Sequence, residues 1–295
     1  MSGAVEIGSG TVNLDLIRRY RSAFGSFDPA QYEPFLASNP VYHAGMTMRR
    51  GRAAYRQNTG AGKVLYPFGA LRTTERRAVA EGDWVALLTE REAVTNRGAH
   101  YDNLYTFFFE VIDGFVATQV ELLDFRVSSA KFDLSALGAE LRSPGEQRVP
   151  EQVATIPAAD DLSSSAIAKR VALNYLDAFL SFDPERFIDL LGPDPLHQVG
   201  MTKRTGRQAF LDIARMGRIL YPDGIAERTH HVLVSDGRTV ATLVSMRART
   251  NKGVDYENLY GMFLDIHDGR VVSFIEVLDG RVADAAFDLS ALEPR

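Results

Sequence analysis

Two matching sets of polar residues are the first candidates for chemistry. Each set has the pattern Tyr-x-Asn-x-Tyr within an extended apolar run. Because alternate residues of a strand project from the same face, each run would present two phenol hydroxyls and one amide together. Such groups can hydrogen-bond a substrate carbonyl or a developing oxyanion. The competing interpretation is a buried hydrogen-bond network that only fixes the sheet. The residues are Tyr101, Asn103 and Tyr105 in the first set and Tyr256, Asn258 and Tyr260 in the second.

Two acidic residues also occupy matching positions. Glu121 and Glu276 each begin a Glu-x-Leu-Asp motif at the end of a β-type run. A carboxylate on a cavity wall can act as a base or orient an imidazole, with its pKa raised by burial. Alternatively, each carboxylate pairs with an arginine and serves only the fold. The candidate partners are Arg52 or Arg126 in the first case and Arg207 or Arg281 in the second.

These coincidences arise from a tandem duplication. SFDP at 26–29 returns at 181–184, and FDLSAL at 132–137 returns at 287–292, in both cases 155 residues later. Aligned without a gap, residues 20–137 and 175–292 are identical at 51 of 118 positions. Unrelated chains would match at roughly one position in sixteen. We therefore predict one domain over 10–137, a Pro- and Gly-containing linker over 138–164, and a second domain over 165–292.

Each copy is predicted to have helices first and a sheet afterwards. Tyr20 and Tyr175 lie on the inner stripe of an amphipathic helix, where they either fill the core or contact a ligand. A short helix follows Asp-Pro, a strand is expected near 40–47, and a third helix follows Gly-Arg and ends near Gly62. Four extended runs with Asp-Gly and Asn-x-Gly turns complete an antiparallel meander. Each copy is thus of the α+β class, with three helices across a curved sheet.

Composition narrows the possible partners. The 295 residues are 45% hydrophobic and 24% charged, with a net charge of −5 and no basic stretch, so we expect no nucleic-acid partner. No apolar run reaches the roughly 18 residues of a membrane helix, and we expect no membrane partner. The start of the sequence does not resemble a secretory signal, and we expect a cytoplasmic protein.

The sequence gives no sign of a cofactor or metal. Cysteine is absent, which excludes thiol catalysis and cysteine-ligated zinc. Dinucleotide, phosphate-loop and paired-His zinc motifs are missing, and the adjacent pair His230-His231 has diverging side chains on a strand. The expected partner is therefore a hydrophobic small molecule, together with self-association of the two halves or of whole chains.

Four motifs occur in the same order in both copies. They are Gly-Arg before the third helix, Tyr-[Asp/Glu]-Asn-Leu-Tyr, Asp-Gly at a hairpin, and Glu-x-Leu-Asp on the last strand. The ordered set resembles the SnoaL-like and ketosteroid-isomerase-like branch of the nuclear transport factor 2 superfamily. The resemblance implies a cone-shaped barrel with a pocket between helices and sheet, often paired through the sheet. Two copies in one chain then imply an internal pseudo-dimer.

The resemblance also marks the position of a general base. In ketosteroid isomerases the base lies nine residues before the glycine of the Gly-Arg motif. Counting back from Gly51 and Gly206, that position holds Tyr42 in one copy and His197 in the other. No carboxylate stands there, and His197 is the better base because an imidazole titrates near pH 6.5. His43 follows Tyr42, and only one of the two can face the cavity. Asn103 and Asn258 stand where those enzymes have a neutral carboxylic acid, so a donor is kept but the acid is not.

The sequence predicts a cofactor-free acid–base enzyme of the isomerase, dehydratase or cyclase type. Its substrate would be a hydrophobic, oxygenated small molecule such as a polyketide, steroid or terpenoid. His197, or Tyr42 or His43 with Glu121, would move the proton, and one pocket would be active while the other is degenerate. The alternative is a non-catalytic ligand-binding or structural pseudo-dimer, because this fold hosts both kinds of protein. An epoxide hydrolase would need an Asp–Arg–Asp set, which we cannot place on neighbouring strands.

Overall fold

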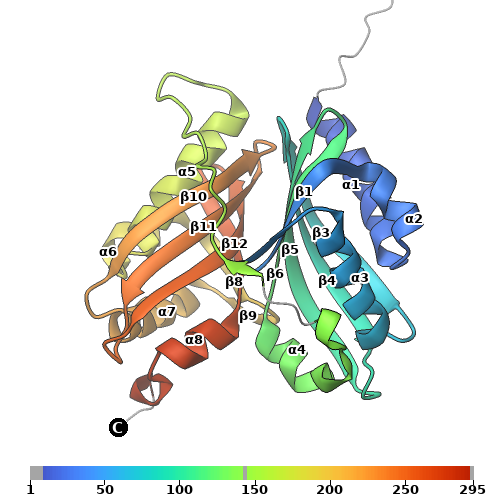
Figure 1. The fold of residues 1–295 in the computed structure, drawn as a ribbon. Helices are drawn as coiled ribbons and strands as arrows, with labels where there is room; N and C mark the ends of the chain where they lie inside the picture. The colour runs from blue at the N-terminus through green and yellow to red at the C-terminus, as the bar shows by residue number, and fades with distance from the viewer. Residues whose placement is uncertain (1–8, 142–144, 293–295) are drawn as a thin grey trace, which may run out of the picture.

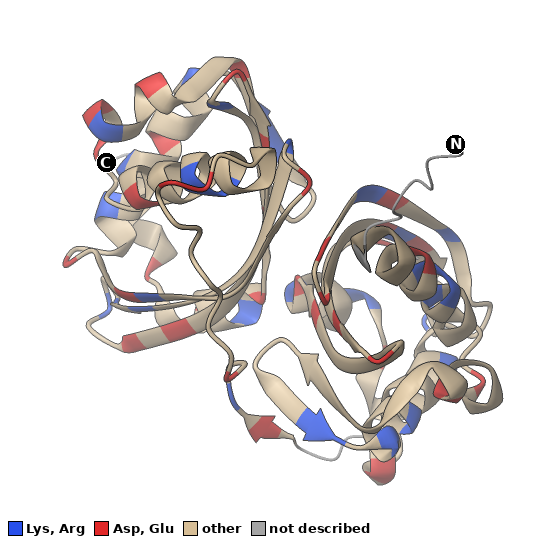
Figure 2. Cartoon of the chain, turned by 90° about the horizontal axis from the view of Figure 1, so that it is seen from above, with Lys and Arg blue, Asp and Glu red and all other residues tan. Residues whose placement is uncertain are grey.

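The computed structural model describes residues 9–141 and 145–292. Two α+β units follow one another, each with a curved sheet on one side and helices on the other (Figure 1). No helix in these two ranges combines the length and apolar character needed to cross a membrane. Acidic and basic residues are scattered over both units without a basic face (Figure 2).

In the first unit three helices and two short strands precede four long strands, and a fourth helix follows them. Its helices are α1 (Ser9–Gly25), α2 (Pro29–Tyr32), α3 (Arg52–Leu65) and α4 (Phe125–Lys131). Its strands are β1 (Leu36–Ala44), β2 (Thr47–Arg50), β3 (Ala70–Glu81), β4 (Trp84–Val94), β5 (His100–Ile112) and β6 (Phe115–Leu123). Short 3-10 turns occupy Glu33–Phe35, Leu134–Ala136 and Ala139–Leu141, and β7 (Glu146–Gln147) follows.

The second unit repeats this order of elements. Its helices are α5 (Ser164–Phe179), α6 (Pro184–Phe187), α7 (Arg207–Leu220) and α8 (Gly280–Ala286). Its strands are β8 (Leu191–Val199), β9 (Thr202–Thr205), β10 (Ile225–Ser235), β11 (Thr239–Arg249), β12 (Asp255–His267) and β13 (Arg270–Leu278). The 3-10 turns Ile188–Leu190 and Leu289–Leu292 complete it. The predicted fold class, two tandem α+β barrels, is confirmed.

Each sheet is mostly antiparallel with one parallel pair. The strand order is β3-β4-β5-β6-β1-β2-β7 in the first and β10-β11-β12-β13-β8-β9 in the second. β1 runs parallel to β6, and β8 runs parallel to β13. The strand predicted near 40–47 is in fact two strands, because Gly45 adopts a left-handed conformation (φ 57°) and turns β1 into β2. The third helix continues to Leu65, three residues beyond the predicted end.

Local sequence sets where the helices begin. Asp28 and Asp183 cap α2 and α6 through their side chains, and the proline that follows each of them suits the first helical turn. Gly51 and Gly206, both at φ 80°, precede α3 and α7, and such a conformation favours glycine. These helices then cover the inner face of each sheet, where a separate aromatic-rich core forms in each unit.

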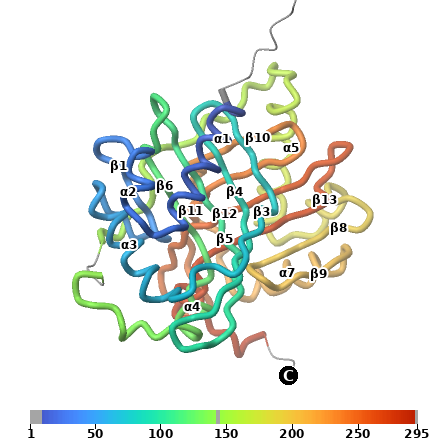
Figure 3. Tube along the Cα trace, turned by 90° about the vertical axis from the view of Figure 1, so that its right-hand side faces the viewer, coloured from blue at the N-terminus to red at the C-terminus, as the bar shows by residue number. Residues whose placement is uncertain are grey.

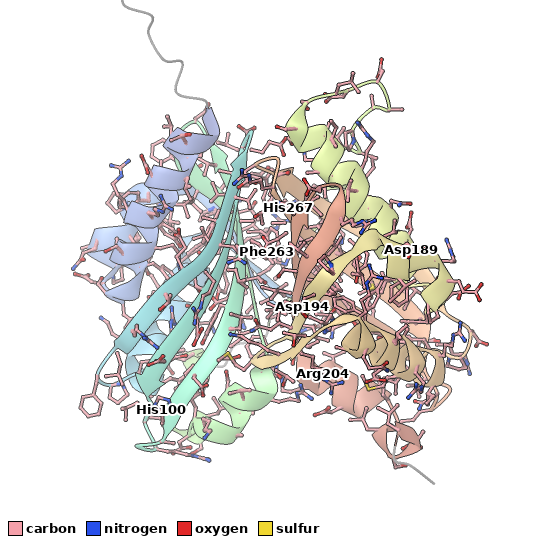
Figure 4. The ribbon with its side chains drawn as sticks, turned by 180° about the vertical axis from the view of Figure 1, so that it is seen from behind. His100, Asp189, Asp194, Arg204, Phe263 and His267 are labelled. Atoms are coloured by element: carbon pink, nitrogen blue, oxygen red, sulfur yellow. The ribbon has the colours of Figure 1, made fainter. Side chains whose placement is uncertain are left out.

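A third core joins the backs of the two sheets. Buried residues from β3–β6 of the first unit meet buried residues from β10–β13 of the second. The strands of the two sheets cross in Figure 3, and Figure 4 places Phe263 between them. The members of this core include Val79, Leu88, Leu104, Phe108, Val120, Leu243, Leu259, Phe263, Ile275 and Val277.

Equivalent residues of the two copies meet at this interface. The Phe108 and Phe263 rings lie 6.4 Å apart between centroids. A Cβ atom at Gly261 would lie only 2.1 Å from Oγ1 of Thr106, its own counterpart. Contacts between equivalent positions are the mark of a two-fold interface, so the chain forms an internal pseudo-dimer.

Ion pairs around this interface also connect the two units. Arg77 forms a forked pair with Asp265, with the closest atoms 2.6 Å apart. Glu81 contacts Lys169 at 2.5 Å and accepts a hydrogen bond from the backbone nitrogen of Ser235 at 2.9 Å. Arg126 contacts Asp284 at 3.0 Å.

His43 lies on the outer face of β1, toward the second unit, and is only 2% exposed. Burial lowers its pKa to about 4, with Arg50 and His231 adding to the effect. His230 is also buried, and burial lowers its pKa to about 4. Both imidazoles are therefore neutral at neutral pH, and both resist protonation in the folded protein.

We predict that Gly261→Ala destabilises the protein by about 1–3 kcal/mol, because the new methyl group collides with Thr106 inside a packed interface. Thr106→Gly in the same chain should restore most of the loss, which a double-mutant cycle of urea denaturation would measure. A neutral single variant, or a double variant no better than the single, would contradict the proposed close contact.

We predict that the free energy of unfolding falls on acidification between pH 6.5 and 4. Unfolded histidine binds its proton near pH 6.5, whereas folded His43 does so only near 4, so the unfolded state binds more protons in this window. His43→Gln, which installs the residue that the second copy has at this position, should flatten the fall. The measurement is urea denaturation across this pH range, with exposed His267→Gln as the control. An unchanged pH slope in His43→Gln would contradict the assignment.

Candidate active site

A cavity of about 180 Å³ lies between the helices and the sheet of the first unit. Its apolar walls come from α1, α3, β6 and α4, and they include Phe24, Leu65, Leu123 and Phe132. Arg281 from the second unit lies at its rim, where it is already paired with Asp279. The cavity therefore has a largely hydrophobic interior into which a few polar side chains project.

One wall carries a carboxylate held by a phenol. Tyr42 on β1 donates a hydrogen bond to Oε2 of Glu121 on the adjacent strand β6, at 2.5 Å. Asn58 on α3 donates in turn to the Tyr42 hydroxyl, also at 2.5 Å. Burial raises the pKa of Tyr42 well above its usual range, and the Glu121 charge raises it further, so Tyr42 remains a donor.

The arginine partners considered for Glu121 are engaged elsewhere. Arg52 donates to the carbonyl oxygen of Leu36 at 3.1 Å, and Arg126 pairs with Asp124. The expectation that Glu121 pairs with one of them is wrong for this structure. Arg207 likewise donates to a backbone carbonyl and Arg281 pairs with Asp279, so neither pairs with Glu276.

The structure also settles which residue of the first strand faces inward. Tyr42 lines the cavity, and His43 points to the opposite face, into the contact with the second unit. His43 therefore lies outside the cavity that Glu121 lines.

Two further groups in the cavity are arginines that sequence reasoning missed. Arg21 extends from α1, with its guanidinium carbon 3.7 Å from the centroid of the Phe107 ring. Arg91 extends from β4, with its guanidinium carbon 5.0 Å from the Tyr105 ring. Both face the charge of Glu121 without a direct salt bridge to it in the described part of the chain.

A chain of hydroxyl groups lies beside Glu121, on the neighbouring strand β5 and in the loop after α3. The Tyr66 and Tyr105 hydroxyls, both in the lining, lie 3.0 Å apart. The Tyr101 hydroxyl lies 2.6 Å from that of Tyr105 and 3.2 Å from that of Ser128. Tyr101 is thus behind the cavity surface, and Tyr66 is the member of the chain that the sequence did not single out.

Asn103 and Asn258 are fully used within their sheets. Asn103 donates to the Tyr101 hydroxyl at 3.1 Å and to the backbone oxygen of Asp124 at 3.0 Å. Its side-chain oxygen accepts from the backbone nitrogen of Leu104. Asn258 makes the same three bonds in the second unit. Asn103 is not among the residues that line the first cavity, and Asn258 lines a separate pocket between the two units. In both, the side-chain groups are already engaged in these bonds.

Tyr20 is also held within the core. Its hydroxyl donates to the side-chain oxygen of Gln119 at 2.6 Å, and the residue is fully buried. Its counterpart Tyr175 is equally buried, but its hydroxyl has no hydrogen-bond partner in the described residues, because Phe274 replaces the glutamine.

The interior of the second unit is much less polar. His197 lies among Phe179, Phe210 and Phe274 and is 2% exposed. Its Nε2 lies 3.2 Å from Oε1 of Glu276, although not in hydrogen-bonding geometry. The Tyr256 and Tyr260 hydroxyls lie 2.5 Å apart, as in the first unit.

Three substitutions between the copies explain why the second interior is less polar than the first. Leu176, Ile213 and Met246 stand where the first unit has Arg21, Asn58 and Arg91. These three polar groups of the first cavity therefore differ between the copies, whereas Glu121 and Tyr66 are shared. Our sequence reasoning gave most weight to positions that the copies share, and so it passed over these three.

A comparison of the sequence with protein-family models finds one match. Residues 17–119 match the family model of the SnoaL-like domain. No curated protein matches the chain significantly.

Solved structures match about two fifths of the chain each. A nuclear transport factor 2-like protein from Burkholderia xenovorans LB400 is 14% identical, with a TM-score of 0.37, over 42% of this chain and 98% of its own. Bal32a from a soil-derived mobile gene cassette is 20% identical, with a TM-score of 0.38, over 43% and 100%. A ketosteroid isomerase-like protein from Catenulispora acidiphila, solved with trimethylamine, is 10% identical, with a TM-score of 0.36, over 40% and 91%.

Residues 17–119, the segment that builds most of the cavity, thus match the SnoaL-like domain family, and the second half of the chain repeats the same strand order.

Proposed function

We propose that the cavity of the first unit is the active site of a cofactor-free acid–base enzyme. It would act on a hydrophobic, oxygenated small molecule such as a polyketide, steroid or terpenoid, by isomerisation, dehydration or ring closure. The observation that carries this proposal is the Glu121 carboxylate, which faces an apolar cavity and is held there by the Tyr42 hydroxyl. The first unit, rather than His197 in the second, therefore has the better-equipped site.

The roles follow from the hydrogen bonds. Glu121 takes a proton from a carbon next to a substrate carbonyl, and Tyr42 fixes the carboxylate through its other oxygen. The electrons of the broken C–H bond move onto the carbonyl oxygen, which becomes an enolate. Tyr66, at the cavity end of the hydroxyl chain, is placed to donate a hydrogen bond to that oxygen. Return of the proton from Glu121 to another carbon completes an isomerisation. In a dehydration the enolate expels a β-hydroxyl group, which takes that proton and leaves as water.

We predict that Glu121→Gln lowers catalysed proton exchange by at least about 100-fold, because an amide cannot accept the proton. The assay follows deuterium uptake from D₂O into unsaturated cyclic ketones and 1,3-diketones by mass spectrometry. Glu276→Gln, the matched change in the second unit, should keep most of the activity. Loss of activity in Glu276→Gln alone would move the site to the second unit. Ketones that bind without any exchange would instead favour the alternative function, a non-catalytic binding protein.

We predict that Tyr42→Phe lowers the rate of catalysed proton exchange by about tenfold, much less than Glu121→Gln does. The carboxylate remains, but it loses the hydrogen bond that fixes its orientation. Tyr32→Phe is the matched control, because Tyr32 bonds Thr59 away from the cavity and the second unit has Phe187 there. A wild-type exchange rate in a folded Tyr42→Phe protein would contradict this role.

A further inference from the structure

The described lining of the first cavity has more positive than negative charge. Arg21, Arg91, Glu121 and Arg281 are its charged lining residues, and Arg281 is paired with Asp279. Two guanidinium groups and one carboxylate leave one unbalanced positive charge inside a largely apolar space. Arg21 and Arg91 are half-buried, and charge withdrawn from water in this way is stabilised by a compensating partner.

The two arginines have no direct hydrogen-bond or salt-bridge partner within residues 9–141 and 145–292. Neither makes a hydrogen bond to an acceptor there, and no carboxylate lies within salt-bridge distance of either. The Nε atom of Arg91 is buried and has no hydrogen-bond partner. Burial lowers the pKa of Arg21 to about 10, helped by repulsion from Arg91, and Arg21 is still protonated at neutral pH.

Aromatic rings hold both side chains in place. Phe107 lies under Arg21, and the Tyr66 and Tyr105 rings lie near Arg91 at 5.6 and 5.0 Å. Stacking on ring faces orients a guanidinium but leaves its N–H donors available at the edge. The donors of both groups are thus presented to one small cavity.

The fold itself does not need these arginines. The second unit reaches the same topology with Leu176 and Met246 at the equivalent positions, both fully buried in its core. A structural requirement would apply equally to both copies, so the charged pair is explained by something that only the first cavity binds.

We propose that the ligand of the first cavity is a hydrophobic carboxylic acid, whose carboxylate is bound by Arg21 and Arg91 while its apolar body contacts the aromatic walls. A carboxylate supplies the single negative charge that the cavity lacks, and it accepts hydrogen bonds from the edge of a guanidinium. This inference names the ligand class of the site described under the proposed function and rests on it in that respect.

The test compares aryl acids with their neutral amides. Isothermal titration with 2-naphthoate and cinnamate, against 2-naphthamide and cinnamamide, should show the acids binding about tenfold or more tightly, because charge-assisted hydrogen bonds contribute at least that much. Arg91→Met and Arg21→Leu, which install the residues of the second unit, should each abolish most of the preference. Arg215→Met removes a charge from a side chain that is 73% exposed and should leave the preference intact.

Three results would overturn the inference: equal binding of acid and amide, failure of both acids to bind, or an unchanged preference in the folded Arg91→Met and Arg21→Leu proteins. Thermal melting shows whether these variants are folded.

Glu121→Gln separates this inference from the proposed function. It should bind the acids at least as tightly as the wild type, since a like charge is removed, and yet lose proton exchange. Acid binding without any exchange in the wild type would leave this inference standing and remove the proposed enzyme.

Discussion

The apolar contact between the backs of the two sheets determines which face of each sheet can hold a binding site. Once Phe108, Phe263 and their neighbours bury the outer faces, each sheet has only its inner face left for a binding site. The helices cover that inner face and enclose the cavity. Sheet packing thus places Tyr42 and Glu121 inside and His43 at the interface, although Tyr42 and His43 are adjacent in sequence.

The two interiors have diverged in a consistent direction. The first keeps a carboxylate, two arginines and an amide around a cavity, whereas the second places leucine, methionine and isoleucine at the equivalent arginine and amide positions. The residues that hold the sheets and turns remain the same in both, as the matching bonds of Asn103 and Asn258 show. The positions that the copies share therefore include the framework of the fold as well as the carboxylate Glu121, and the differences mark what is peculiar to the first cavity.

Much of the architecture could be predicted from the sequence because it depends on local signals and repetition. Asp-Pro, Gly-Arg and Asp-Gly mark the same boundaries twice, and alternation gives the strands. The site was harder, because the partners of Glu121 are set by which strands lie side by side. The parallel pairing of β1 with β6 brings Tyr42 to Glu121, and no spacing in the chain indicates it. Arg21 and Arg91 are far apart in sequence and meet only across the cavity.

The close approach of Thr106 to Gly261 has a consequence for how this protein evolved. Two identical subunits must place the same residue on both sides of their symmetry axis, and two threonines there would collide. In a tandem chain each half can change by itself. The threonine–glycine match is one such change, and it lets the two sheets approach closely where two threonines would crowd each other.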